Sequence, residues 1–171
     1  MEVALAKGFM SSIFSSSQNG SILYGLAHQA QAYILYDPCF LRYDVVNFLG
    51  YWTISGAEYF LFSKKEAQTS SIFVPAVKLM VGKLKTMVVA GSETNLFAKA
   101  LASNITGLDG VSIYGMAQCT GDMKKSTCIE CLTYIEDLLP SKCGDKSGCR
   151  FFYNSCFVRY EIYDFFTSKS R

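Results

Sequence analysis

Apolar side chains recur at helical spacing in the middle of the chain. Proline is favoured at the first position of a helix, and Pro75 opens a run whose apolar members lie mostly three or four residues apart: Val77, Met80, Val81, Leu84, Met87 and Val88. Gly91 follows, and glycine commonly ends a helix. The pattern therefore predicts a helix over residues 75–90.

A second helical pattern lies closer to the C-terminus. Thr127 and Glu130 have the spacing of a capping box, in which two side chains bond free backbone amides at the start of a helix. Apolar positions then share one face as far as Leu139, and Pro140 is expected to end the helix because it lacks an amide hydrogen. We therefore expect a short helix between Thr127 and Leu139.

Apolar and aromatic runs around these two segments indicate strands. One pair is joined by the turn-forming segment 107–110 and predicts a hairpin, and a later pair is rich in Phe, Tyr and Val. In chain order the expected strands cover residues 59–62, 101–105, 111–118, 150–154 and 157–163. This order predicts an α+β domain in which two helices pack on one face of an antiparallel β-sheet.

The cysteines are concentrated in this second part of the chain. Three of the seven form a C-x8-C-x2-C array at Cys119, Cys128 and Cys131, and Cys156 lies in a later expected strand. The spacing puts Cys128 and Cys131 on one helix face, within reach of strand ends, which is typical of a disulfide framework. Because seven is odd, at least one cysteine stays free or pairs with another chain.

Two short internal repeats divide the chain. Tyr24-Gly-Leu-Ala27 matches Tyr114-Gly-Met-Ala117 at an offset of 114 − 24 = 90, and Cys39-Phe-Leu-Arg-Tyr-Asp44 matches Cys156-Phe-Val-Arg-Tyr-Glu161 at an offset of 156 − 39 = 117. The first copy therefore lacks 117 − 90 = 27 residues, the part that would hold the cysteine array and its helix. We expect residues 1–50 to be a truncated copy and residues 51–171 to be a complete domain.

Composition narrows the classes of function. Half of the residues are hydrophobic, which allows a real core, and a net charge of +2 with dispersed basic residues gives no electrostatic footprint for nucleic acid. The most apolar run, residues 73–90, contains three lysines, so we expect no transmembrane segment. The N-terminus, with Glu2 and no long apolar segment, does not have the pattern of a signal peptide. The chain is then either a piece of a secreted precursor or a cytosolic protein with reduced thiols.

The motifs together resemble a known family. Tyr114–Cys119, the cysteine array and Cys156–Glu161 are similar to the plant ginkbilobin-type, stress-antifungal cysteine-rich domain, over residues 73–166 and, in part, over residues 21–49. That domain occurs, usually in tandem, in cysteine-rich repeat secretory proteins, in the ectodomains of cysteine-rich receptor-like kinases and in plasmodesmata-located proteins. The resemblance implies an extracellular location, in the apoplast or at the cell surface.

The resemblance also implies two disulfides. They join Cys119 to Cys128 and Cys131 to Cys156. The chain-entropy model gives about 2.7 kcal/mol for the first loop and about 3.5 kcal/mol for the second. We therefore expect the complete domain to depend on oxidation for its stability.

A third disulfide of the family has no obvious counterpart. The family pattern pairs Cys143 with a cysteine near the start of the domain, but none lies between Cys39 and Cys119. Cys149 stands where the family usually has a small residue. A bridge from Cys143 to Cys149 and a link from either of them to Cys39 are both open.

Ginkbilobin-type domains bind mannose through an Asn, an Arg and a Glu, and the resemblance places the last two on Arg150 and Glu161. A guanidinium donates hydrogen bonds to sugar hydroxyls, and a carboxylate accepts hydrogen bonds from them. The Asn has no counterpart in residues 55–62. The alternative is that Arg150 and Glu161 form a cross-strand ion pair on the solvent face of the sheet. The first copy has Tyr33 and Asp44 at these positions, so no sugar site is expected there.

Other chemistries have less support in the sequence. Cys128, Cys131, Cys143 and Cys149 could be read as zinc ligands, but no zinc-ribbon turn surrounds them, and a redox role lacks the strand and crossover of a thioredoxin unit. The single histidine, His28, has no nearby nucleophile. We therefore expect neither catalysis, metal nor cofactor.

The sequence favours a non-enzymatic extracellular recognition module in plant defence or stress response, with a mannose-type glycan or a cell-surface protein as partner. The alternatives are a piece of a receptor-like kinase ectodomain or plasmodesmata-type protein that acts by protein association, and a degenerate product that binds nothing.

Overall fold

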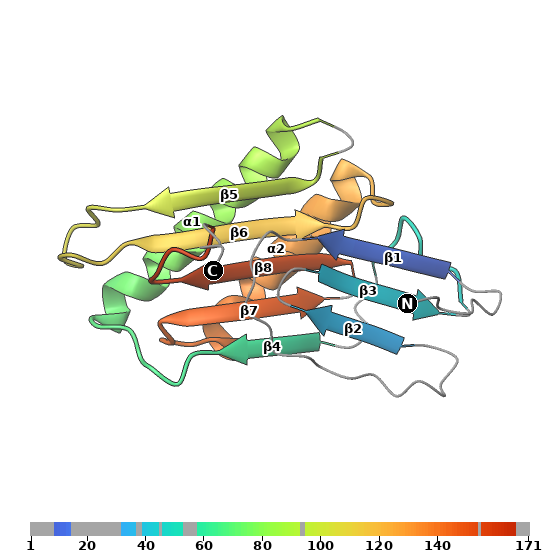
Figure 1. Ribbon diagram of the computed structural model, residues 1–171. Coiled ribbons are helices and arrows are strands. Elements are labelled where there is room, and N and C mark those ends of the chain that lie inside the picture. Colours follow the sequence, from blue (N-terminus) through green and yellow to red (C-terminus); the bar gives the residue numbers. More distant parts are fainter. Residues whose placement is uncertain are drawn as a thin grey trace, which may run out of the picture.

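The structure is a computed structural model that describes residues 9–14, 32–36, 39–44, 46–52, 58–92, 95–153 and 155–166. The described part contains two helices, α1 (Ser70–Ala90) and α2 (Lys125–Lys142), and two antiparallel sheets (Figure 1). Neither helix combines the length and the apolar character that crossing a bilayer requires, as far as the described residues extend.

The larger sheet has five strands in the order β4-β7-β8-β6-β5. Their bounds are β4 (Glu58–Phe62), β5 (Phe97–Ala102), β6 (Ile113–Cys119), β7 (Gly148–Tyr153) and β8 (Cys156–Glu161). Both helices lie behind this sheet in Figure 1, with α1 on β5 and β6 and α2 on β7 and β8. The predicted α+β fold, with two helices on one face of an antiparallel sheet, is confirmed.

The core lies between the helices and the sheet. Most buried side chains of helix α1 lie three or four residues apart, among them Phe73 and Leu84, and α2 contributes Leu132 and Ile135. The strands alternate, so every second side chain of β7 and β8 meets these helices. Burying one such side chain contributes about 1.5–3 kcal/mol, which makes this layer the main source of stability.

The first helix starts earlier than its pattern predicts. It begins at Ser70, one turn and more before Pro75. The amides of Ile72 and Phe73 donate to the carbonyl of Thr69, and Phe73 is fully buried in the core. Tertiary burial of Phe73 therefore fixes a first turn that proline preference alone does not predict.

The bounds of the second helix were also predicted wrongly. Helix α2 begins at Lys125 after Lys124, which makes no side-chain cap, so the capping box at Thr127 does not form. The helix continues through Pro140 to Lys142, and the amide of Cys143 still donates to the carbonyl of Leu139. A disulfide from Cys143 to Cys149 holds this end of the helix against the sheet. This covalent constraint offsets the local free-energy cost of a proline inside the helix.

The smaller sheet lies within residues 1–50, the segment that is predicted to be a truncated first copy. It has the order β1-β3-β2, with β1 (Phe9–Phe14), β2 (Ala32–Tyr36) and β3 (Cys39–Asp44), and it lies in front of the five-stranded sheet in Figure 1, on the side away from the helices. The β2–β3 hairpin pairs Tyr36 with Cys39 as the β7–β8 hairpin pairs Tyr153 with Cys156. This common register agrees with the predicted repeat.

The rest of the repeat prediction has a mixed outcome. Residues 24–27 lie outside the described part of the chain, so their match to β6 stays a prediction. The strand that pairs with β3 as β6 pairs with β8 is β1, because Phe14 lies opposite Cys39 and Cys119 opposite Cys156. The division into residues 1–50 and 51–171 also stays a prediction.

Candidate functional site

The predicted sugar residues meet on the sheet face that points away from the helices. Arg150 comes from β7 and Glu161 from β8, and Arg150 Nε lies 3.5 Å from Glu161 Oε1. Arg159 lies directly opposite Arg150, and its Nε donates a hydrogen bond of 3.1 Å to the same carboxylate oxygen. We call these three residues the Arg–Glu cluster. Two guanidinium groups thus share one carboxylate.

The Arg–Glu cluster is buried to different depths. Glu161 is 7% exposed and Arg159 3% exposed, whereas the side chain of Arg150 is 20% exposed. The cross-strand ion pair of the alternative interpretation is therefore present, but its carboxylate is buried and does not lie on the solvent face. Arg150 is the member that a ligand in solution can reach.

The segment after β8 explains this burial. Phe165, itself buried, places its ring 4.1 Å from the guanidinium carbon of Arg159, and the Arg159 guanidinium also donates to the Tyr163 hydroxyl at 3.2 Å. A cation over an aromatic face is stabilised by the ring quadrupole. The chain thus folds back over the end of β8 and covers the inner part of the cluster.

Gly148 provides the space for the carboxylate. It lies opposite Glu161 in the β7–β8 pair, and a Cβ atom added at this position would collide with the Glu161 carboxylate. Sequence reasoning did not identify this glycine. The sequence did contain a signal, because glycine occurs together with the longer acid: the first copy has Gln31 and the shorter Asp44 at the positions of Gly148 and Glu161.

Two tyrosines beneath the sheet have raised pKa values. Burial, and then the charge of Glu161, raises the pKa of Tyr160, whose hydroxyl donates to the carbonyl of Lys146 at 3.1 Å. Burial, and then Tyr134, raises the pKa of Tyr153. Both phenols therefore stay neutral in the folded protein well into the alkaline range.

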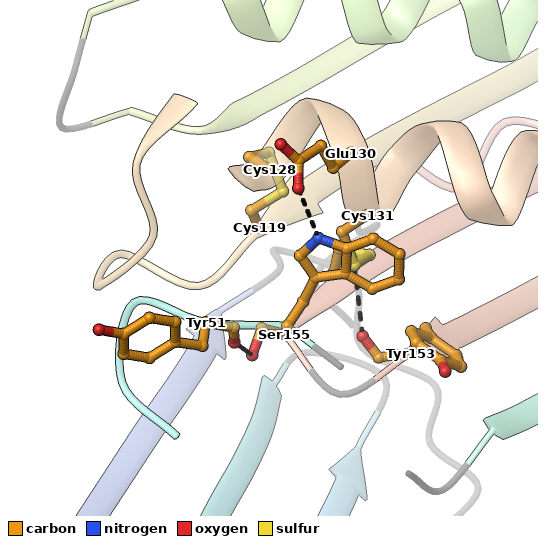
Figure 2. Close-up of a disulfide and its surroundings, with 9 residues drawn as sticks. Tyr51, Cys119, Cys128, Glu130, Cys131, Tyr153 and Ser155 are labelled. Atoms are coloured by element: carbon orange, nitrogen blue, oxygen red, sulfur yellow. Dashed lines mark hydrogen bonds between the residues drawn. A yellow bond between two sulfur atoms is a disulfide. The ribbon is translucent and has the colours of Figure 1, made fainter. Parts of the chain in front are cut away.

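Three disulfides hold α2 against the sheet. Cys119 is joined to Cys128 and Cys131 to Cys156, the two pairs that the family resemblance implies, and Figure 2 shows this region. The third bridge joins Cys143 at the end of α2 to Cys149 on β7, one of the two arrangements left open. The remaining cysteine is Cys39, whose side chain lies outside the described part.

These bridges remove the zinc alternative. The four cysteines considered as ligands are all oxidised, so none is the thiolate that zinc requires. In the part of the chain that the structure describes, no other cluster of His, Cys, Asp or Glu side chains could hold a metal ion.

The segment 46–52 anchors the first copy beside these disulfides. The amide of Gly50 donates to Asp122 Oδ2 at 2.6 Å. Ser155 Oγ donates to the carbonyl of Tyr51 at 3.3 Å, as Figure 2 shows. The Trp52 indole donates to Glu130 Oε2 at 3.2 Å. The segment 46–52, which follows the smaller sheet, is therefore bound to the loop, helix and hairpin turn around the disulfides.

The two copies also share an arginine–phenylalanine contact that sequence reasoning missed. The Arg42 guanidinium carbon lies 3.9 Å from the ring centroid of Phe48, as Arg159 lies over Phe165, and both phenylalanines are buried. Each phenylalanine follows its arginine by six residues, and both members are repeated at the offset of 117. Extending the repeat beyond Glu161 to Phe165 would have found this pair.

Comparison with known proteins agrees with this framework. The family model described as salt stress response/antifungal matches residues 62–163. The chain is 30% identical to cysteine-rich repeat secretory protein 55 of Arabidopsis thaliana, over 94% of this chain and 70% of that protein. It is 33% identical to an antimicrobial ginkbilobin-2-like protein of Castanea crenata, over 78% of this chain and 53% of that protein.

A solved structure shows the same fold. The tandem DUF26 ectodomain of the cysteine-rich receptor-like protein PDLP8 from Arabidopsis thaliana superposes with a TM-score of 0.62 and 24% identity, over 78% of this chain and 56% of that chain. This chain thus spans only about half the length of that ectodomain and of the ginkbilobin-2-like relative. With its matched domain, two-helix fold and cysteine array, the chain belongs to the salt stress response/antifungal family of plant cysteine-rich, extracellular-type domains.

Proposed function

We propose that this chain is a non-catalytic extracellular recognition module of plant defence or stress response, and that it binds a mannose-type glycan weakly through the Arg150–Glu161 pair. In this pair Arg150 contacts the sugar and the buried Glu161 holds Arg150 in place. The observation that carries the proposal is the meeting of these two side chains on one sheet face, with Arg150 partly exposed. The relatives named as secretory and antimicrobial proteins support the location and the role in defence.

The geometry assigns different tasks to the two arginines. Arg159 holds the carboxylate at hydrogen-bond distance, while Arg150 lies at a longer 3.5 Å from it. A guanidinium has five N–H donors, so Arg150 can donate to sugar hydroxyls while it stays beside Glu161. The absent Asn removes one hydrogen bond worth about 0.5–1.5 kcal/mol, which lowers affinity roughly 2- to 13-fold.

Titration calorimetry with mannose and a mannan oligosaccharide tests the proposal. We expect heat from the wild type and none from Arg150→Ala, with nearly unchanged melting because Arg159 still pairs with Glu161. Lys146→Ala is the matched control: it removes a surface cation that pairs with Glu66 at 3.2 Å, outside the cluster, and it should bind as the wild type does. Absence of heat from folded wild type, or equal binding by Arg150→Ala, rejects the lectin function.

Protein association is a second candidate, and the edge strand β4 favours it. Three consecutive apolar side chains there, Phe60, Leu61 and Phe62, are 36%, 38% and 50% exposed. Strand β4 ends the five-stranded sheet, and an exposed apolar edge can pair with a strand of another chain. The occupant we favour is a second copy of this chain in antiparallel orientation, because Glu58 at one end of β4 would then approach Lys64 beyond the other.

Sedimentation equilibrium over a concentration series separates this function from the first. The wild type should form a dimer, and Leu61→Lys should stay monomeric. Leu79→Lys is the control, since Leu79 is 76% exposed on α1, away from the edge. A monomeric wild type at all concentrations, or dimers of Leu61→Lys, contradicts the association.

A further inference from the structure

The loop between β5 and β6 presents two polar side chains to solvent. Asn104, Ile105 and Thr106 lie one residue beyond the end of β5, and both Asn104 and Thr106 are exposed. Neither of these two polar side chains makes a hydrogen bond within the described part of the chain. The order Asn-x-Thr, with a residue other than proline in the middle, is an acceptor sequence for N-linked glycans.

The remainder of the loop is held from beneath. Ile105 packs against the main core, and Leu108 is buried. The amide of Leu108 donates to the carbonyl of Ile105 at 2.9 Å, and the amide of Val111 donates to that of Leu108 at 3.1 Å. The inward residues thus fix the loop, and the two sequon side chains remain on its outer surface.

We propose that Asn104 carries an N-linked glycan. The inference rests on the proposed extracellular function, because the modification occurs in the secretory pathway. In the reaction the Asn104 amide nitrogen forms a C–N bond to the first sugar of a lipid-pyrophosphate-linked oligosaccharide, the C–O bond to the pyrophosphate breaks, and the amide loses one proton. Attachment precedes complete folding, so the folded structure must leave room for the glycan, and an exposed Asn104 at a hairpin end does so.

The backbone gives Asn104 a second reason to be asparagine. Its φ is 55°, in the left-handed region, where asparagine is better tolerated than most residues. Asn104→Gln would therefore change the turn as well as the acceptor. Thr106 has no such backbone role in the structure, so its substitution tests glycosylation without straining the turn.

The experiment expresses the full chain behind a cleavable secretion leader in plant cells and measures intact mass before and after treatment with a peptide:N-glycosidase. We expect the wild type to lose the mass of a glycan, with position 104 marked by the conversion of asparagine to aspartate in peptide maps. Thr106→Ala should lose the glycan at position 104 completely, and Thr106→Ser should keep it. Asn19→Gln removes the other sequon of the chain and should leave position 104 modified.

The outcomes separate this inference from the proposed function. Because the leader directs the chain into the secretory pathway, folded secreted protein with unmodified Asn104 overturns the glycosylation inference alone. Equal occupancy in Thr106→Ala also overturns it. Native protein found only in the cytosolic fraction of its source tissue overturns the extracellular function and leaves the acceptor property of the loop standing.

Discussion

The hairpins β2–β3 and β7–β8 have the same register but different surroundings. In each hairpin a tyrosine lies opposite the cysteine that begins the second strand. Each hairpin is followed by a phenylalanine whose ring lies against an arginine of that strand. Only the second hairpin is described with two helices and three disulfides around it. The hairpin pattern is therefore local, whereas the framework that covers it comes from distant parts of the sequence.

The comparison extends to the residues of the Arg–Glu cluster. Arg159 and Arg42 occupy equivalent positions, but Arg150 and Glu161 correspond to Tyr33 and Asp44. The second copy thus combines the shared arginine with residues of its own. What is common to both copies stabilises the hairpin, and what differs makes up the rest of the Arg–Glu cluster.

Reduction of the disulfides should give the largest loss of stability. The chain-entropy model assigns the three loops, of 9, 25 and 6 residues in separation, about 8 kcal/mol together, comparable to the net stability of a whole domain. We expect circular dichroism to show loss of the five-stranded unit in the reduced, alkylated protein. Cys39→Ser should melt as the wild type does. A reduced protein with an unchanged melting transition would contradict the dependence on oxidation.

Replacing the arginine found at the equivalent position of each hairpin tests whether Arg42 and Arg159 contribute equally to stability. Arg159→Ala leaves the buried Glu161 with only the longer contact to Arg150, and breaking a buried charge pair costs about 3 kcal/mol. Arg42→Ala removes a contact with Phe48 worth about 1 kcal/mol. Urea denaturation measures both. Equal losses would mean that the aromatic contact, and not the carboxylate, determines the effect.

Filling the space beside Glu161 should give a smaller loss. The added methyl of Gly148→Ala meets the carboxylate, and overpacking typically costs about 1–3 kcal/mol. The control is Gly121→Ala, where the added Cβ has no neighbour within 4 Å, and which should be neutral or slightly stabilising. If thermal unfolding gave the two variants the same midpoint, Glu161 would not be confined as described.

Alkaline pH should give the most gradual effect. Burial raises the folded-state pKa of both Tyr153 and Tyr160, while the unfolded tyrosines ionise near pH 10. Their contribution to stability is thus fully present below about pH 10 and falls by about 1.4 kcal/mol per tyrosine for each pH unit above it. Tyrosinate absorbance at 295 nm should report two groups that ionise only as the circular dichroism signal is lost. Ionisation of all tyrosines before unfolding is the opposite result.

Much of the fold could be predicted because its signals are local. The β7–β8 and β5–β6 hairpins and the two helices follow from apolar spacing and turn residues, although β5 begins four residues before the predicted strand. The helix ends could not be predicted in this way. Burial of Phe73 and the bridge at Cys143 fix them, and both depend on residues far along the chain.

The residues Arg150 and Glu161 of the candidate site could be predicted from the sequence, but their burial could not. The resemblance identified Arg150 and Glu161, and the structure places them in contact. Their burial depends on Phe165 folding back over Arg159 and on the space at Gly148. Neither effect follows from the periodicity of a single strand, because both arise between segments.

The disulfides also determine how the protein can respond to mechanical tension. The bridges Cys119–Cys128 and Cys131–Cys156 close 9 and 25 residues of separation into covalent loops that are almost adjacent in the chain. A force applied to the two termini therefore passes through the sulfur atoms and through the short α2 segment between Cys128 and Cys131. The part of α2 after Cys131 and the strand β7 stay unstretched even after the sheet has separated. At about 3.3–3.6 Å per residue, those loops hold back on the order of 100 Å of extension until a reductant releases it.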